Sequence, residues 1–228
     1  MYGIIFDMDG VLFPTEDLKF RAYQDVFKNL YNIDIKETPG RIGLSETKAM
    51  ELFLNIYNKQ GDSSKIQELI QKKREVYYNI LEKQDFSPIT GVEEFLKKIK
   101  LSGEFKVGLA TSSNLKSTEI LIKKFGFKKY FDSILSLEHV IKPKPDPEIY
   151  LSSAKLLGID PSCCVVFEDS PTGLEAAKRA GMYRVGIATG ISREQIQTFS
   201  DLAINDFRDI KIENIKKLIN QFKNKYKV

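Results

Sequence analysis

Two carboxylates follow a short apolar segment near the amino terminus, in Ile4-Ile5-Phe6-Asp7-Met8-Asp9-Gly10. Side chains alternate along an extended chain, so Asp7 and Asp9 would leave the end of a strand on the same side, close enough to share a metal ion. The alternative is an Asp-rich turn, in which Asp and Gly serve the backbone. This segment alone leaves both interpretations open.

A second polar segment, Thr111-Ser112-Ser113-Asn114, follows an apolar run over residues 105–110. Hydroxyl groups beside the backbone N–H groups of a helix start form a suitable binding site for phosphate. The structural alternative is that Ser113 or Asn114 caps the following helix.

A third segment, Ile141-Lys142-Pro143-Lys144-Pro145-Asp146-Pro147, holds lysines between prolines. The prolines restrict the backbone, so an ammonium group could neutralise charge at one defined point. The alternative is a stiff surface loop, in which Asp146 caps a helix that begins at Pro147.

A fourth segment places Glu168 and Asp169 directly after the apolar run 165–167. Two adjacent acids at the end of a buried strand are electrostatically unfavourable unless a cation offsets them. The same residues also suit a helix start, with Ser170 as the cap and Pro171 in the first turn.

The elements that would position these segments alternate between strands and helices. Alternation of this kind predicts a doubly wound parallel sheet covered by helices on both faces, an α/β fold whose functional groups lie beyond the carboxyl ends of the strands. We expect strands at residues 3–6, 105–110, 131–135, 163–167, 183–187 and 202–204, and helices at 92–100, 115–125, 147–157, 172–180 and 209–222.

Residues 15–85 interrupt this alternation. Three stripes of apolar residues with helical spacing predict three helices there. Pro14 stands at the entrance, and Ser87-Pro88-Ile89-Thr90-Gly91 stands at the exit. We therefore expect an α/β core domain made of residues 1–14 and 86–228, with a helical cap domain at 15–85.

The composition limits the classes of partner. The 228 residues are 42% hydrophobic and 29% charged, with a net charge of +4. The lysines are scattered rather than gathered in a basic stripe, which argues against nucleic acid as a partner. We expect no membrane partner, a cytoplasmic location and a monomer, because neither a secretory leader nor a membrane-spanning run is evident. The adjacent Cys163 and Cys164 are predicted to be reduced.

Taken in order, Asp7-Met8-Asp9-Gly10, Thr111-Ser112, Lys144-Pro145 and Glu168-Asp169 resemble the four signature segments of the haloacid dehalogenase superfamily. The chain looks most like the branch that contains β-phosphoglucomutase and small sugar-phosphate or phosphoglycolate phosphatases. The resemblance covers nearly the whole chain. It implies a Rossmann-like core with a helical cap inserted after the first strand.

The resemblance also implies roles for the residues that match. Asp7 would be the nucleophile and form an aspartyl phosphate. Asp9 would act as general acid and base. The expected cofactor is Mg²⁺, with Asp7, Asp9 and Asp169 as metal residues and Glu168 as a direct or indirect one.

The phosphoryl group would be bound by Thr111, Ser112 and Lys144. We prefer Lys144 to Lys142, because the spacing from Lys142 to Pro145-Asp146 is two residues too long.

Two basic residues of the cap, Arg41 and Lys19, are candidates for contact with substrate, although both could equally lie on solvated faces. The sugar-phosphate mutases that this chain resembles carry a histidine where Lys19 stands, so its absence favours simple hydrolysis. The single histidine, His139, is predicted to be structural.

The predicted function is that of a Mg²⁺-dependent phosphatase acting on a small phosphomonoester, such as a sugar phosphate. The main alternative is a phosphosugar mutase of the β-phosphoglucomutase type. A catalytically silent binding protein on the same fold is a further alternative. Carbon–halogen hydrolysis is disfavoured, because that reaction needs neither Asp9 as a proton donor nor an acidic pair for Mg²⁺.

Overall fold

The apolar runs form one six-stranded parallel sheet, in the order β3-β2-β1-β4-β5-β6. The computed structural model describes residues 1–38, 40–41 and 44–226. The strands are β1 (Tyr2–Phe6), β2 (Phe105–Ala110), β3 (Ser133–Leu135), β4 (Cys164–Glu168), β5 (Tyr183–Ile187) and β6 (Leu202–Ile204). Strand order reverses around β1, which pairs with β2 on one side and with β4 on the other. The predicted doubly wound α/β fold is confirmed.

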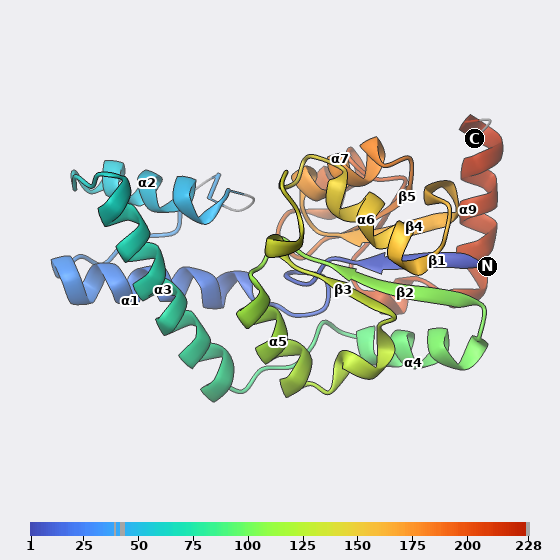
Figure 1. The fold of residues 1–228 in the computed structure, drawn as a ribbon, viewed down its shortest axis with the longest axis horizontal. Helices are drawn as coiled ribbons and strands as arrows, with labels where there is room; N and C mark the ends of the chain where they lie inside the picture. The colour runs from blue at the N-terminus through green and yellow to red at the C-terminus, as the bar shows by residue number, and fades with distance from the viewer. Residues whose placement is uncertain (39, 42–43, 227–228) are drawn as a thin grey trace. The chain divides into compact units, whose positions relative to one another are not determined.

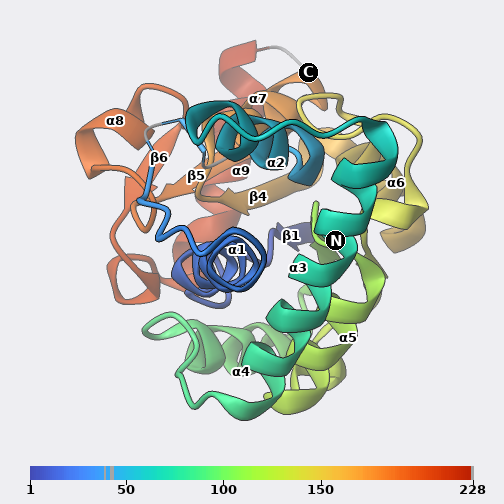
Figure 2. The same ribbon diagram turned by 90° about the vertical axis from the view of Figure 1, so that its left-hand side faces the viewer.

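Helices cover both faces of this sheet (Figures 1 and 2). On one face lie α6 (Glu148–Leu157), α7 (Pro171–Arg179) and α8 (Arg193–Gln197), and on the other lie α4 (Val92–Ser102), α5 (Leu115–Lys124) and α9 (Ile212–Tyr226). Short 3-10 turns occur at Phe127–Tyr130, Leu137–His139, Pro161–Cys163 and Phe207–Asp209. Helix α6 begins one residue later than predicted. Helix α9 begins three residues later, because residues 207–209 form one of these turns.

The alternation of side chains along the central strands separates two layers of core. Ile5 and Val166 pack in one layer with residues of α6 and α7 such as Ile149 and Ala176. Phe6 points to the opposite face, where its ring stacks on that of Phe167 with centroids 5.0 Å apart. Together the two layers bury all of β4 and residues 3–6 of β1, so the loops that follow these strands start from fixed points.

The chain divides into two compact units, one made of residues 1–14 and 86–228 and the other of residues 15–85. The second unit consists of α1 (Glu16–Tyr31), α2 (Glu46–Ile56) and α3 (Ser63–Lys83). Its own core gathers apolar side chains from all three helices, among them Phe27, Phe53 and Leu69. An independent core of this kind is what a separate helical subdomain requires.

Within the described part of the chain, we find no helix with the length and apolar character needed to cross a membrane.

Candidate active site

Asp7 and Asp9 lie in a tight turn directly after β1. The N–H of Asp7 still donates to the carbonyl of Phe167, over 2.9 Å, so the strand pairing with β4 continues to this residue. Gly10 then adopts a left-handed conformation, with a φ of 70°, and its N–H donates to the carbonyl of Phe13 over 2.8 Å. The catalytic and the turn interpretations of this segment are therefore compatible, because the turn is what presents the carboxylates.

Lys144 lies between two buried carboxylates. Its Nζ donates to Asp7 Oδ1 over 2.6 Å and to Glu168 Oε1 over 2.7 Å, and also to the carbonyl of Ala110 over 3.2 Å. The ammonium group also lies 4.7 Å from the centroid of the Tyr150 ring. Lys142, by contrast, is exposed. Of the two lysines, the structure brings Lys144 to Asp7.

Glu168 is held by donors on both oxygens. Oε1 accepts from Lys144 and from the Tyr150 hydroxyl, the latter over 3.0 Å, while Oε2 accepts from the backbone N–H of Asp169 and from the N–H and hydroxyl of Ser170. Gly173 leaves room for this carboxylate, because a Cβ there would lie 1.7 Å from Oε1. Ser170 also caps α7, as the structural alternative proposed, so capping and site formation use the same residue.

Asp169 contacts the turn after β1. A Cβ on Gly10 would lie 1.9 Å from Asp169 Oδ2, so the absence of a side chain at Gly10 lets this carboxylate approach the turn that carries Asp7 and Asp9. Asp169 itself is almost fully buried. Three carboxylate residues from two neighbouring strand ends therefore share one edge of the sheet.

The segment after β2 contributes hydroxyl groups. Thr111 is fully buried, its N–H donates to the carbonyl of Leu135, and its hydroxyl accepts from the N–H of Ser113. The hydroxyl of Ser113 donates to Asp9 Oδ2 over 2.5 Å. Asn114 caps α5 through a bond from the N–H of Ser117, and Ser112 is exposed.

The pKa values of the buried groups are shifted, because several buried acids lie around one lysine. Burial raises the pKa of Asp7 to about 7, helped by Glu168 and Asp9 and opposed by Lys144. Burial alone would also raise the pKa of Glu168, but Lys144 and the bonds from Ser170 outweigh it and lower that pKa. In Lys144, Asp7 and Glu168 overcome the effect of burial and raise the pKa well above its usual value.

The donor set fits Mg²⁺. In the described part of the chain, no three His, Cys, Asp or Glu side chains form a complete metal cage. Magnesium does not require one, because it retains several waters and binds one or two carboxylates together with phosphate oxygens. Asp7 and Asp169 offer such oxygens at one edge. Glu168, whose oxygens already accept from Lys144, Tyr150, Ser170 and the N–H of Asp169, is better suited to hold the lysine.

The two basic residues predicted to contact substrate lie together within the helical unit. Lys19 donates to Glu16 over 2.7 Å, and Arg41 contacts both Glu37, at 2.8 Å, and Glu16, at 3.5 Å. The guanidinium of Arg41 also lies over the ring of Phe20. The side chain of Arg41 is only 5% exposed, so it is part of an ordered polar cluster rather than of a solvated face.

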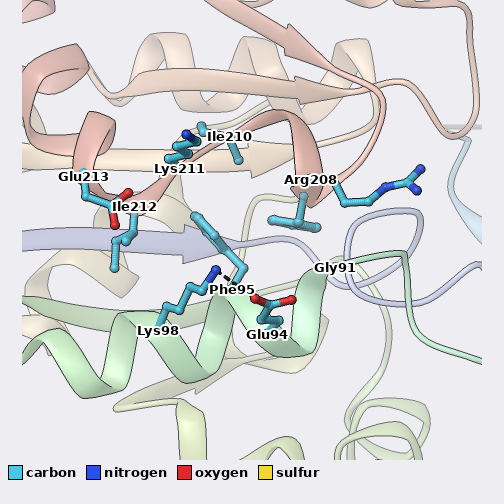
Figure 3. Close-up of a pocket in the computed structure, with 10 residues that line it drawn as sticks. Gly91, Glu94, Phe95, Lys98, Arg208, Ile210, Lys211, Ile212 and Glu213 are labelled. Atoms are coloured by element: carbon cyan, nitrogen blue, oxygen red, sulfur yellow. Dashed lines mark ion pairs between the residues drawn. The ribbon is translucent and has the colours of Figure 1, made fainter.

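A separate surface cavity of about 430 Å³ lies between α4 and the segment 207–213 (Figure 3). Apolar side chains such as Phe95 and Ile212 line it together with charged ones, of which Glu94 and Lys98 pair with each other. None of the predicted site residues lines it. We assign this cavity no part in the chemistry.

His139, predicted to be structural, bonds to Ser136 in the turn that follows β3.

Four residues with contacts in the site were not among the predicted site residues: Ser113, Tyr150, Ser170 and Thr189. The rule that function lies beyond strand ends could have pointed to Ser113 and to Thr189, which follows β5. Tyr150 lies in the apolar stripe of α6, and no sequence signal separates its hydroxyl from those of other core tyrosines.

A doubly wound sheet that gathers buried acids and a lysine at the carboxyl ends of its strands is typical of an α/β enzyme that transfers a charged group. The chain belongs to the haloacid dehalogenase-like hydrolases, and residues 4–187 match that family.

Named relatives refine this placement. The chain is 33% identical over 186 residues to a phosphorylated carbohydrates phosphatase of Thermotoga maritima, covering 81% of this chain and 84% of that protein. It is 27% identical to a β-phosphoglucomutase of Bacillus subtilis, over 98% of this chain and 97% of that one. A hydrolase of this family from Entamoeba histolytica superposes with a TM-score of 0.86 at 26% identity, over 96% of this chain and 100% of that one. The predicted family and the predicted phosphatase class are confirmed.

Proposed function

We propose that this protein is a Mg²⁺-dependent phosphatase that hydrolyses a small sugar phosphate through an aspartyl phosphate on Asp7. The observation that carries the proposal is the ammonium group of Lys144, held within 2.7 Å of both Asp7 and Glu168. A fixed cation beside a buried carboxylate is what attack by one anion on another requires.

The reaction proceeds in two displacements. In the first, a carboxylate oxygen of Asp7 attacks phosphorus, the bond from phosphorus to the sugar oxygen breaks, and Asp9 gives its proton to the departing alkoxide. In the second, Asp9 takes a proton from water, which attacks the same phosphorus, and Asp7 leaves as a carboxylate. Inorganic phosphate and the free sugar are the products.

The groups around phosphorus stabilise its oxygens during both steps. Lys144 and the hydroxyl of Thr111 bind these oxygens together with the N–H of Ser112. Asp7, Asp169 and the carbonyl of Asp9 would hold Mg²⁺, which would supply additional positive charge. Glu168 keeps Lys144 in place, since its second oxygen is fixed by Ser170.

The hydroxyl of Ser113 affects the proton transfers that are assigned to Asp9. This hydroxyl donates to Asp9 Oδ2, a bond that favours the carboxylate over the acid. Asp9 must be protonated to act as the acid in the first displacement, and Oδ1 can carry that proton while Oδ2 still accepts from Ser113.

The likeness to a phosphorylated carbohydrates phosphatase supports a sugar phosphate as the substrate class. The likeness to a β-phosphoglucomutase keeps mutase activity as a second candidate. Hydrolysis is the better supported of the two. Lys19 stands where the mutases that this chain resembles have a histidine, and its ammonium group forms an ion pair with Glu16.

Phosphate release from a panel of sugar monophosphates, with Mg²⁺ or with EDTA, tests the proposal. We expect release only with Mg²⁺, and none from Asp7→Asn. Conversion of a hexose 1-phosphate to its 6-phosphate without phosphate release would instead establish the mutase. If no sugar phosphate reacts while the purified protein binds one, the protein is a silent binding protein.

A further inference from the structure

Thr189 links the loop after β5 to the turn after β1. Its hydroxyl donates to the carbonyl of Gly10 over 2.6 Å. The two strands are not neighbours, because β4 lies between them in the sheet. This bond therefore passes over the end of β4, where Asp169 emerges.

The loop that carries Thr189 is itself fixed. The N–H of Ala188 donates to the carbonyl of Ile204 in β6 over 2.9 Å, and the N–H of Thr189 donates to the carbonyl of Ile187 over 3.0 Å. A hydroxyl anchored in this way can fix the peptide group that it binds. That group belongs to Gly10, which has no Cβ and so has access to more backbone conformations than any other residue type.

Thr189 and Asp169 contact the same glycine. A Cβ built on Gly10 would lie 1.9 Å from Asp169 Oδ2 and 3.1 Å from the Thr189 hydroxyl, and one built on Gly190 would lie 3.6 Å from Asp169 Oδ2. The carboxylate of Asp169 thus lies against a surface formed by Gly10 on β1's side and by the Thr189 loop on β5's side. Gly10 therefore joins the carbonyl that Thr189 binds to the preceding Asp9 carbonyl, and it also borders the carboxylate of Asp169.

We propose that Thr189 is a positioning residue that sets the affinity of this enzyme for its divalent cation. It acts through the Gly10 carbonyl, which it holds so that Asp169 and the turn carrying Asp7 stay at the spacing a cation needs. This inference rests on the proposed function, because it takes these carboxylates as the metal residues. Residues that orient metal ligands without touching the metal commonly contribute strongly to affinity.

Thr189 can be tested with matched variants. Thr189→Val keeps the shape and removes the hydroxyl, whereas Thr189→Ser keeps the hydroxyl and removes a methyl group. The control is Thr198→Val, at another exposed threonine whose hydroxyl donates to a backbone carbonyl, that of Gln195. Because both threonines are exposed, neither substitution disturbs the core.

The measurement is calorimetric titration of each metal-free variant with MgCl₂, without substrate. We expect the Kd of Thr189→Val for Mg²⁺ to rise about tenfold, while Thr189→Ser and Thr198→Val stay within about twofold of the wild type. An unchanged Kd in Thr189→Val, or an equal rise in Thr189→Ser, would overturn the positioning role and leave the proposed function standing. A wild-type protein that binds no Mg²⁺ would overturn both.

Discussion

Replacing Asp7 by Asn should make the metal-free protein more stable while it abolishes turnover. Asp7 is 6% exposed, and burial raises its pKa from an ordinary value of 3.8 to about 7. Keeping this residue ionised near neutral pH therefore costs folding free energy. Asn has the same shape, carries no charge and still offers an oxygen to the ammonium group of Lys144.

The magnitude follows from the pKa difference. A rise from 3.8 to about 7 corresponds to about 4 kcal/mol of folding free energy, at 1.36 kcal/mol for each pKa unit. Between these two values the folded protein binds more protons than the unfolded chain, so the wild type loses stability as the pH rises through this window. The loss is absent below pH 3.8 and complete above about pH 7. The Asn variant lacks this dependence.

Urea unfolding of both proteins in EDTA, at pH 5 and at pH 8, measures the effect. The stability advantage of Asp7→Asn should be about 2 to 3 kcal/mol larger at pH 8 than at pH 5. Asp25→Asn removes an exposed carboxylate of α1 and should show no such dependence. An advantage that is equal at the two pH values, or an Asn variant that is less stable at pH 8, would refute the reasoning. Added Mg²⁺ should then stabilise the wild type selectively.

Three further predictions concern activity and metal binding. Lys144→Met should lower kcat/KM by about 100-fold to 1000-fold, because it removes a group that stabilises the charge of the transition state. The control Lys142→Met, at an exposed lysine, should leave kcat/KM within about twofold. Gly10→Ala should lose Mg²⁺ binding in calorimetry, because the added Cβ would overlap the carboxylate of Asp169. The control is Gly103→Ala, at a glycine that is also left-handed but whose added Cβ would have no other atom within 4 Å. This control should cost only about 1 kcal/mol of stability and should still bind the metal. Glu16→Gln should raise KM by about threefold to tenfold with less change in kcat, because Glu16 contacts both Lys19 and Arg41, whereas Glu37→Gln, at a half-exposed partner of Arg41, should have a smaller effect. Equal effects of the two glutamate substitutions would contradict the last of these.

The fold was predictable because its strands are short apolar runs that alternate with amphipathic helices. Five of the six strands begin and end within one residue of the predicted limits, and the sixth, β3, is shorter than expected because Phe131 ends a preceding turn. Of the five predicted core helices, α9 is the one whose start differs from the predicted start by more than one residue. Asp209 was expected to begin that helix, yet Asp206 accepts from the N–H of Arg208 and residues 207–209 form a separate 3-10 turn before α9.

The site was predictable to the extent that parallel strands deliver their carboxyl ends to one edge. That rule brings Asp7, Thr111 and Glu168 together from strands far apart in sequence. It does not say which oxygen of Glu168 faces Lys144, because that depends on Ser170 and Tyr150, which bind the carboxylate from two different helices. Nor does it identify Thr189, whose role depends on the peptide orientation of Gly10.

Charge balance at this edge explains why Asp7, the proposed nucleophile, has a raised pKa. The ammonium group of Lys144 donates to both carboxylates. Glu168 has the lower pKa of the two, because it also accepts from Ser170 and Tyr150, whereas the negative charge of Asp9 lies beside Asp7. Lys144 alone therefore leaves Asp7 only partly ionised at neutral pH. On the proposed function, the remaining positive charge comes from the cation, so the nucleophile becomes fully anionic only when the site is loaded. On the same proposal, the ionisation of Asp7, and with it its reactivity as a nucleophile, is coupled to binding of the cation.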